Sequence, residues 1–395
     1  MNIVLVNWSK GGNDPFTFFN DQISEHFADF GARCFRVELD ENLFNEIIHL
    51  HDKYIIHAVI VWQGIGSAVK LNDGSLLWDH LKVPVISLHG DHPCHMPDNH
   101  LSDSRYVLHT YPIAEWTDYA NRNFKKVFPA LTLNQPNFIR SSQDQFEKAG
   151  DYFVFPKNYK DLDVSRAEWA DKFGKLMPSV LNSIADSLIK NYKSGDLIEL
   201  HDCIDEHINE EVIGSISEEL SLSSSFELYH YIHSISDNCY RNIVSQDAVV
   251  QLKDFPVHIY GSGWEALKER DRYKNYQFRE FDRVVDGRHQ FNSQFGIIDV
   301  APHMQCLHDR TLRAISYGSG FLINSKIKIF DKDRVLFEDL FYSGVDHSLF
   351  DKAEAVISNP IRHRERVRDF GFSYDLKYSF ENFYRFIYSI HRALN

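Results

Sequence analysis

Two neighbouring stretches near the C-terminus decide the fold: Gly296–His303 (GIIDVAPH) and Leu307–Asn324 (LHDRTLRAISYGSGFLIN). The first begins with an apolar run typical of a buried strand. The second contains a short helix that opens with His-Asp-Arg and ends at a glycine, followed by another apolar run. A strand, a helix and a strand in this order predict part of a parallel α/β sheet. Phosphate-bearing ligands usually bind at the C-terminal edge of such a sheet.

The helix in the second stretch carries two arginines. Asp309 suits the N-cap or first turn, and Gly318 suits the position just after the helix. Arg310 and Arg313 lie three residues apart and can point to the same side. Together with His308 and the N–H groups of the helix N-terminus, they would form a diphosphate site. The alternative is that both arginines are solvated and the helix only packs on its sheet.

The first 135 residues also alternate between strand and helix patterns. Apolar runs without strict alternation are typical of strands that are covered on both faces. The predicted strands are residues 3–7, 33–38, 58–62, 84–89, 106–110 and 126–128, and the predicted helices are 16–30, 43–51 and 76–81. This alternation predicts βαβ units, a mostly parallel sheet and a first Rossmann-like domain over residues 1–150.

The next hundred residues have a different pattern. Their apolar residues recur at helical spacing, and strand signals are few. The predicted helices are 167–176, 180–192, 197–209 and 226–252. We therefore predict a mainly helical bridge over residues 151–253.

Strand–helix alternation resumes after Pro256 and predicts a second Rossmann-like domain over residues 254–376. Its predicted strands are 257–260, 296–300 and 320–324. The closing segment, 377–395, is predicted to be an amphipathic crossover helix. Its apolar face is formed by Phe383, Phe386, Ile387, Ile390 and Leu394. The predicted fold class is thus α/β, with two Rossmann-like domains, a helical segment and a C-terminal helix.

Composition excludes several classes of protein. At 395 residues, the chain is long enough for two domains. The formal charge of −14 argues against a general nucleic-acid binder, which needs a basic surface. The five cysteines are scattered and never paired as CxxC, which favours a reducing compartment and argues against a structural zinc site. No signal peptide and no run of 18 apolar residues is present, so we expect a cytoplasmic protein without a transmembrane segment.

A glycine-rich turn follows the predicted strand 257–260. It reads Gly261, Ser262, Gly263 and Trp264. Glycines directly after a strand permit a tight turn and a close approach of the backbone to a ligand. An ordinary strand–helix turn is the alternative for the glycines, and core packing is the alternative for the tryptophan.

Histidines and an aspartate follow the predicted strand 84–89. His89, Asp91 and His92 are candidates for a general base, because histidine titrates near neutral pH and an aspartate can orient it. A metal site is a weaker alternative, since the spacing matches no standard ligand set and no cysteine joins it. A purely structural turn is the third possibility.

The loop after the first predicted strand is also rich in glycine. It contains Lys10, Gly11, Gly12 and Asp14, which we interpret as an acceptor-side loop that covers a ligand. It is not a Walker A loop, because its lysine precedes both glycines.

Taken together, these motifs resemble a known family. The chain from Val257 onward resembles the GT-B glycosyltransferases of the group 1 kind, especially the CgeB-like branch. The resemblance rests on Tyr260–Trp264 (YGSGW) and on His308–Gly318 (HDRTLRAISYG), with a weaker match at Asp91–Pro93 (DHP).

This resemblance implies two Rossmann-like domains that face each other across a cleft. A nucleotide-sugar donor would be held mostly by the C-terminal domain, and the acceptor would face the N-terminal one. It implies no cofactor and no divalent metal. The family often has a glutamate before Ala314 that binds the ribose, whereas this chain has Arg313. That difference leaves open an unusual donor or a loss of activity.

We therefore expect a metal-independent glycosyltransferase that moves a sugar to a hydroxyl group on a glycan, a lipid-linked glycan or a protein. Arg310 would neutralise the departing phosphate. The alternative is a non-catalytic module with the same fold that binds a nucleotide or a glycan. A Rossmann-type oxidoreductase is disfavoured, because no turn reads GxGxxG with an acidic residue about 20 positions later.

Overall fold

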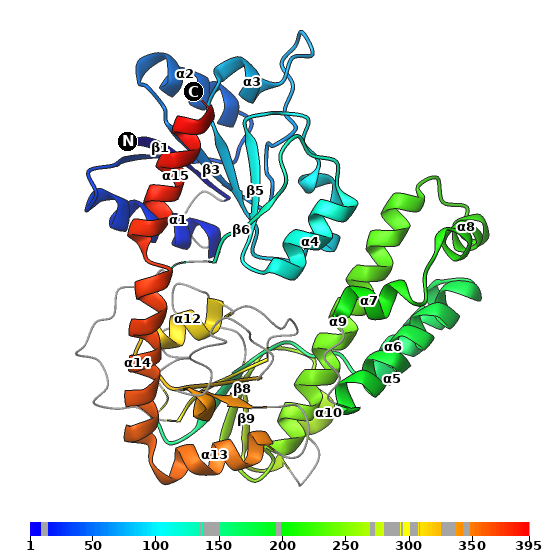
Figure 1. Cartoon of the computed structure of the whole chain (residues 1–395). Coiled ribbons are helices and arrows are strands. Elements are labelled where there is room, and N and C mark those ends of the chain that lie inside the picture. The colour runs from blue at the N-terminus through cyan, green and yellow to red at the C-terminus, as the bar shows by residue number, and fades with distance from the viewer. Residues whose placement is uncertain are drawn as a thin grey trace. The chain divides into compact units, whose positions relative to one another are not determined.

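The computed structural model describes residues 1–8, 15–134, 136, 150–194, 199–268, 273–279, 293, 295–300, 307, 309–324, 337–342 and 348–394. Contacts within the chain define two compact units (Figure 1). Unit 1 is formed mainly by Met1–Arg140 and Phe372–Asn395, and unit 2 by Ser141–Asp282 and Arg288–Gly371. In the part of the chain that is described, each unit contains a parallel sheet of six strands.

The sheet of unit 1 has the strand order β2-β1-β3-β4-β5-β6. Its strands are β1 (Asn2–Asn7), β2 (Arg33–Glu38), β3 (Ala58–Trp62), β4 (Val85–Leu88), β5 (Val107–Tyr111) and β6 (Leu131–Thr132). Its helices are α1 (Pro15–Ala28), α2 (Leu43–Lys53), α3 (Leu77–Leu81), η1 (Pro93–His95), η2 (Pro97–His100), α4 (Ala114–Asn123) and α15 (Phe380–Leu394). All five residues of β3, AVIVW, are buried, as expected for a central strand that is covered on both faces.

The C-terminal helix belongs to unit 1. Figure 1 shows α15, in red, beside α1, in dark blue, and the two helices are in contact. Phe383 and Ile387 of α15 are buried in the same core cluster as Phe27 of α1. The predicted amphipathic helix is confirmed, and its apolar face covers the unit 1 sheet.

The sheet of unit 2 has the strand order β12-β11-β10-β7-β8-β9. Its strands are β7 (Phe153–Pro156), β8 (Val257–Tyr260), β9 (Tyr276–Arg279), β10 (Gly296–Asp299), β11 (Phe321–Asn324) and β12 (Phe341–Tyr342). The shorter helices around it are α10 (Glu265–Lys268), α12 (Asp309–Ser316), η5 (Glu338–Leu340) and α13 (Ser348–Ser358). Helix α14 (Pro360–Lys377) leads from unit 2 into unit 1.

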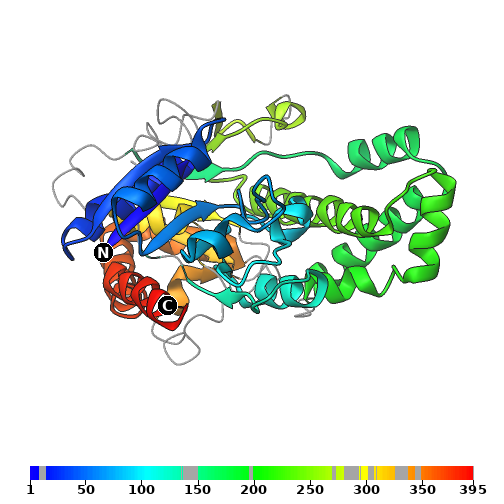
Figure 2. The ribbon, with the colours of Figure 1, turned by 90° about the horizontal axis from the view of Figure 1, so that it is seen from above.

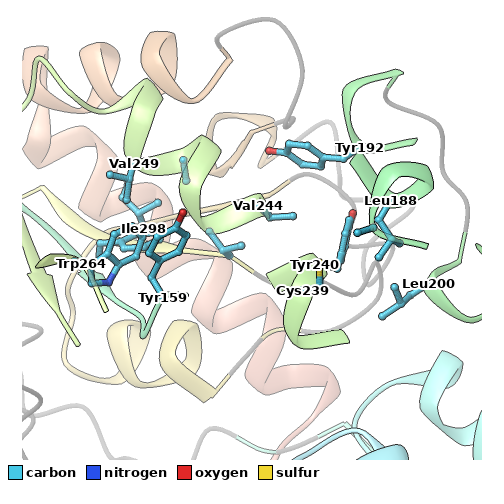
Figure 3. Close-up of a cluster of buried hydrophobic side chains, with 14 of the residues drawn as sticks. Tyr159, Leu188, Tyr192, Leu200, Cys239, Tyr240, Val244, Val249, Trp264 and Ile298 are labelled. Carbon is cyan, nitrogen blue, oxygen red and sulfur yellow. The ribbon is translucent and has the colours of Figure 1, made fainter. Parts of the chain in front are cut away.

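Five further helices of unit 2 pack on one another, and Figure 2 shows them in green. They are α5 (Leu162–Lys172), α6 (Leu176–Ser194), α7 (Leu200–Asp205), α8 (Glu210–Glu219) and α9 (Ser225–Gln251). Their apolar side chains share one buried cluster with the sheet, part of which is shown in Figure 3. In that view Val249 of α9 lies near Ile298 of β10 and Trp264. The helices are therefore part of the core of unit 2.

The structure corrects the sequence-based elements at several points, and helices α4, α13 and α14 were not predicted either. Residues 126–128 do not form a strand; Lys126 makes only an isolated bridge with Ser102, and β6 comes later. Strand β7 was not predicted, although it lies between β10 and β8. Its four residues, FVFP, end in a proline, which weakens a strand signal. Helix α8 was also missed, and the predicted helix 167–176 is interrupted between Lys172 and Leu176.

Two general expectations concern the described residues. None of the helices in this part of the chain combines the length and apolar character needed to cross a bilayer. Cys34, Cys94, Cys203 and Cys239 are in the thiol form, and Cys306 lies outside the described residues. The predicted domain boundaries at residues 150, 253 and 376 remain predictions.

Candidate functional site

The strand order of unit 2 locates its candidate site. Strands β7, β8 and β9 follow one another toward one edge, and β10, β11 and β12 follow one another toward the other. The order therefore reverses between β7 and β10. In open parallel sheets, ligands bind outside the carboxyl ends of the strands at such a switch point.

A carboxylate and two residues of α12 meet at the end of β10. Asp299 is the last residue of β10 and is 1% exposed. Thr311 donates a hydrogen bond from Oγ1 to Asp299 Oδ2 over 2.7 Å, and Arg310 Nη1 lies 3.7 Å from Asp299 Oδ1. The side chain of Arg310 is 21% exposed. The carboxylate thus fixes the first turn of α12 to the sheet and holds a partly exposed guanidinium group at the switch point.

A second basic residue, Lys157, lies directly after β7 and interacts electrostatically with Arg310. Burial lowers the pKa of Lys157 well below its usual value, and the charges of Arg310 and Arg241 lower it further. The carboxylates of Asp299 and Asp237 oppose that effect. Arg241 donates from Nε to Asp237 Oδ2 over 2.7 Å, both on α9. Arg310 and Arg241 therefore both disfavour the charged form of Lys157, and an anion bound at this edge would offset their effect.

The second predicted arginine is placed differently. Arg313 is 9% exposed, and its Nη1 atom lies 4.0 Å from Asp309 Oδ2. Burial lowers its pKa, while the charge of Asp309 raises it. Gly318 has a φ angle of +65°, which confirms the predicted left-handed end of the helix. Arg310 is thus the more accessible of the two arginines, and His308 lies outside the described residues.

The glycine-rich turn packs against the chain that follows β7. A Cβ atom on Gly261 would lie 2.5 Å from the carbonyl oxygen of Lys157, and one on Gly263 would lie 1.7 Å from that of Tyr159. The φ angles of these glycines are +144° and +88°. Close backbone packing within the protein therefore accounts for both glycines.

The other two residues of this turn have distinct environments. Trp264 is 1% exposed, stacks on Tyr159 and donates from Nε1 to the carbonyl oxygen of Lys157 over 2.7 Å. These contacts match the core-packing alternative that the sequence left open for this tryptophan. Ser262 is exposed, and its N–H group donates to Asn158 Oδ1 over 2.9 Å. Only Ser262 of the two is accessible to a ligand.

In unit 1, the three candidate bases after β4 are separated by burial. His89 and His92 are 1% and 2% exposed, whereas Asp91 is exposed. The ring of His92 accepts a hydrogen bond from the backbone of Cys94 and caps η1. Gln63 donates from Nε2 to Asp91 Oδ2 over 2.6 Å. Asp91 is therefore the one candidate base of the three that solvent can reach.

Gln63 has an unusual backbone conformation. It is 3% exposed and has a φ angle of +55°, a left-handed conformation that is uncommon for residues other than glycine. Its N–H group donates to the carbonyl oxygen of Leu88 over 2.9 Å. The surrounding fold holds Gln63 in this strained conformation, and its side chain donates the hydrogen bond that orients Asp91.

The predicted acceptor-side loop follows β1. Strand order in unit 1 reverses between β1 and β3, so this loop comes from a switch point as well. Its residues Lys10, Gly11, Gly12 and Asp14 lie outside the described residues.

Several residues of these sites were missed by sequence analysis: Gln63, Lys157, Asp237, Arg241 and Asp299. A usable signal existed for Lys157 and Asp299, since each is a charged residue at the end of a short apolar strand. The residues of α9 carried no such signal, because their approach to the sheet depends on tertiary packing.

The chain is similar to solved structures over nearly its whole length. T4 phage BGT, solved in complex with its UDP-glucose substrate, is 10% identical with a TM-score of 0.50, and the match covers 98% of this chain and 99% of that chain. An alpha-glucosyltransferase (AGT) in complex with UDP is 10% identical with a TM-score of 0.46, over 98% and 99% of the two chains. The glycosyltransferase SnogD from Streptomyces nogalater is 9% identical with a TM-score of 0.34, over 93% and 94%.

No protein-family model and no curated protein matches the sequence of this chain. The fold class follows from the sheets and from the first of these structures: two parallel α/β units of the GT-B kind. This confirms the predicted fold, whereas the CgeB-like branch remains a prediction.

Proposed function

We propose that the protein is a glycosyltransferase that moves a sugar from a nucleotide-activated donor to a hydroxyl group on a glycan, a lipid-linked glycan or a protein. One observation carries this proposal. Lys157 and Arg310 form a cationic group at the switch point of the unit 2 sheet, together with Arg241. The GT-B fold and the UDP-glucose complex of T4 phage BGT support a nucleotide sugar as the anion.

The donor half of the reaction would use this cationic group. The bond between the anomeric carbon and the phosphate oxygen breaks, and the nucleotide leaves as an anion. Arg310 and Lys157 stabilise the negative charge that develops on the departing phosphate. Because the protein supplies these cations itself, we propose that donor binding requires no divalent metal and no cofactor.

The acceptor half would use Asp91 in unit 1. In an inverting transfer, its carboxylate takes the proton of the acceptor hydroxyl group as the new carbon–oxygen bond forms. Gln63 positions that carboxylate through the 2.6 Å hydrogen bond. His89 and His92 are too buried to serve as the base in this arrangement.

A substitution at Arg310 tests the donor site. We expect Arg310→Ala to lower kcat by about 10²–10³-fold, equivalent to about 3 kcal/mol, as for the loss of one oxyanion-stabilising group. The control is Arg385→Ala, which removes an exposed arginine of α15 that pairs with Glu381. Near-normal turnover by the Arg310 variant would remove this residue from the site.

A panel of UDP-, GDP-, TDP- and CMP-sugars tests the function as a whole. We expect binding of at least one donor class, measured by calorimetry, and hydrolysis or transfer with suitable acceptors. EDTA should leave donor binding unchanged. A bound nucleotide without turnover would support the non-catalytic alternative, and no binding by any member of the panel would overturn both.

A further inference from the structure

Three histidines from separate segments converge inside unit 1. His89 directly follows β4, His100 ends η2, and His109 lies in β5. One ligand atom from each of these rings can be chosen so that all three atoms lie within 4.8 Å of one another. Local sequence patterns did not reveal this group, because its members are up to 20 residues apart.

The rings are close and well shielded from solvent. The exposed fractions of His89, His100 and His109 are 1%, 2% and 1%. His89 Nε2 lies 2.9 Å from His109 Nδ1, and the ring centroids of His89 and His100 are 4.3 Å apart. Tyr111 stacks on His89 and places its hydroxyl group 2.5 Å from His100 Nδ1. A hydrogen bond at one ring nitrogen orients an imidazole whose other nitrogen binds a metal.

Burial disfavours the charged forms of His89 and His109. It lowers the pKa of His89 well below its usual value and that of His109 to about 3. The neutral ring is the form that coordinates a metal ion. The nitrogens of His89 and His109 that face each other are Nε2 and Nδ1, and Ser87 Oγ also lies 2.9 Å from His89 Nε2. The opposite nitrogens of these rings, His89 Nδ1 and His109 Nε2, are buried without a hydrogen-bond partner in the described part of the chain.

We propose that His89, His100 and His109 bind a divalent transition-metal ion of the zinc type. Three imidazole nitrogens are a known protein ligand set for zinc, with a water molecule as the fourth ligand. With metal–nitrogen bonds of about 2.0–2.1 Å in tetrahedral geometry, ligand nitrogens lie about 3.3 Å apart. The His89–His109 pair needs to open by only a few tenths of an ångström from its 2.9 Å separation.

The ion has a structural role in this proposal. It joins the end of β4, η2 and β5, and so fixes the segment between His89 and His100, which carries Asp91. Neither Asp91 nor His92 belongs to the ligand set, since the first accepts from Gln63 and the second contacts Cys94. The ligand set therefore differs from the His89–Asp91–His92 alternative considered from the sequence. The inference does not depend on the proposed function.

Cobalt is a suitable probe, because its visible spectrum reports the number and kind of ligands. The chelator-treated full chain is titrated with Co²⁺. We expect one ion per chain, with the intense absorption of a four- or five-coordinate nitrogen site. His89→Gln and His109→Gln should each weaken the affinity for Co²⁺ by more than about 100-fold. This is more than the loss expected for a residue that only hydrogen-bonds to a metal ligand. His258→Gln, which alters a buried histidine of unit 2, should leave this affinity unchanged.

A second measurement covers the case in which a variant does not fold. Zn²⁺ added to the chelator-treated wild-type chain should raise its Tm and slow amide exchange between residues 89 and 109. If the three rings form only a hydrogen-bonded network, wild-type protein binds no stoichiometric Co²⁺ and Zn²⁺ has no effect, which would overturn the proposal. Binding that persists in the His89→Gln/His109→Gln double variant would overturn it too. Calorimetry on the same samples measures UDP binding, which tests the proposed site in unit 2 independently of the metal site in unit 1.

Discussion

Lys157 obtains its properties from its neighbours. Burial and two nearby arginines lower its pKa, so the unliganded protein holds the proton on this amine weakly. An anionic diphosphate next to the amine would favour the charged form and raise the pKa again. Nucleotide binding would then be coupled to proton uptake.

We therefore predict that UDP binding takes up a proton and weakens as the pH rises. The complex binds more protons than the free protein between the lowered pKa of free Lys157 and its higher pKa in the complex, so affinity falls through that window. Calorimetry in buffers of different ionisation enthalpy measures the uptake. Lys157→Met should abolish it, whereas Lys160→Met, at an exposed lysine paired with Glu168, should not. Equal proton uptake in both variants would contradict this role.

Asp91 is the residue on which the acceptor chemistry depends in our proposal. We predict that Asp91→Asn lowers kcat by about 10²–10⁴-fold, the usual contribution of a general base, without weakening UDP binding. Gln63→Leu should lower kcat less, because it removes only the 2.6 Å hydrogen bond to the carboxylate.

Asp98→Asn is the matched control, since this exposed aspartate lies in η2 of the same segment. Steady-state kinetics over a pH range distinguishes the three variants. An Asp91 variant that turns over like the Asp98 variant would assign the base elsewhere.

At the scale of elements, α15 shows how a C-terminal helix stabilises an N-terminal unit. Ile387 is 0% exposed and packs in one cluster with residues of β1, β3 and α1. Tyr388, the next residue, is 45% exposed. The helix therefore presents one face to the core and the other to solvent.

We predict that Ile387→Ala lowers the free energy of unfolding of unit 1 by about 2–5 kcal/mol, since it removes buried methyl groups and leaves a cavity. Tyr388→Ala should change it by less than about 1 kcal/mol, as expected for an exposed position. Urea denaturation monitored by circular dichroism measures both. Equal effects of the two substitutions would show that Ile387 of α15 does not stabilise the core of unit 1.

At the scale of the whole molecule, the two proposed sites belong to different compact units. We predict that UDP slows amide exchange at residues 157–160 and 309–313 of unit 2, whereas Zn²⁺ slows it at residues 89–109 of unit 1. Exchange measured by mass spectrometry on the full chain, with each ligand alone, tests this. Zn²⁺ protection centred on the unit 2 segments would place the metal at the donor site and contradict both assignments.

Much of the secondary structure was predictable, because most elements are long enough to show a period. Predicted residues 33–38, 58–62 and 257–260 coincide with β2, β3 and β8, and α15 lies within the predicted helix 377–395. The failures include the short strands β7 and β6, of four and two residues, and also the longer helices α4, α8, α13 and α14. Element length alone therefore does not explain which elements were missed.

The candidate site was only partly predictable. Arg310 and Asp91 could be found because each follows a recognisable strand in a motif. Lys157, Arg241 and Asp299 could not be grouped, since the first follows β7, the others belong to α9 and β10, and all three are distant in sequence. For Gly261 and Gly263, a glycine pattern alone does not show whether protein backbone or a ligand approaches it, and the structure shows protein backbone close to both.

By itself, the sequence determined the α/β class, the division into strand–helix halves and the amphipathic closing helix. These depend on the local spacing of apolar residues, which the chain carries in every segment. Only the tertiary structure decided that Asp91 is exposed while His89 and His92 are buried, that Lys157 joins Arg310, and that three distant histidines meet. Burial and charge at those positions are produced by side chains from other strands and helices, and no local pattern specifies them.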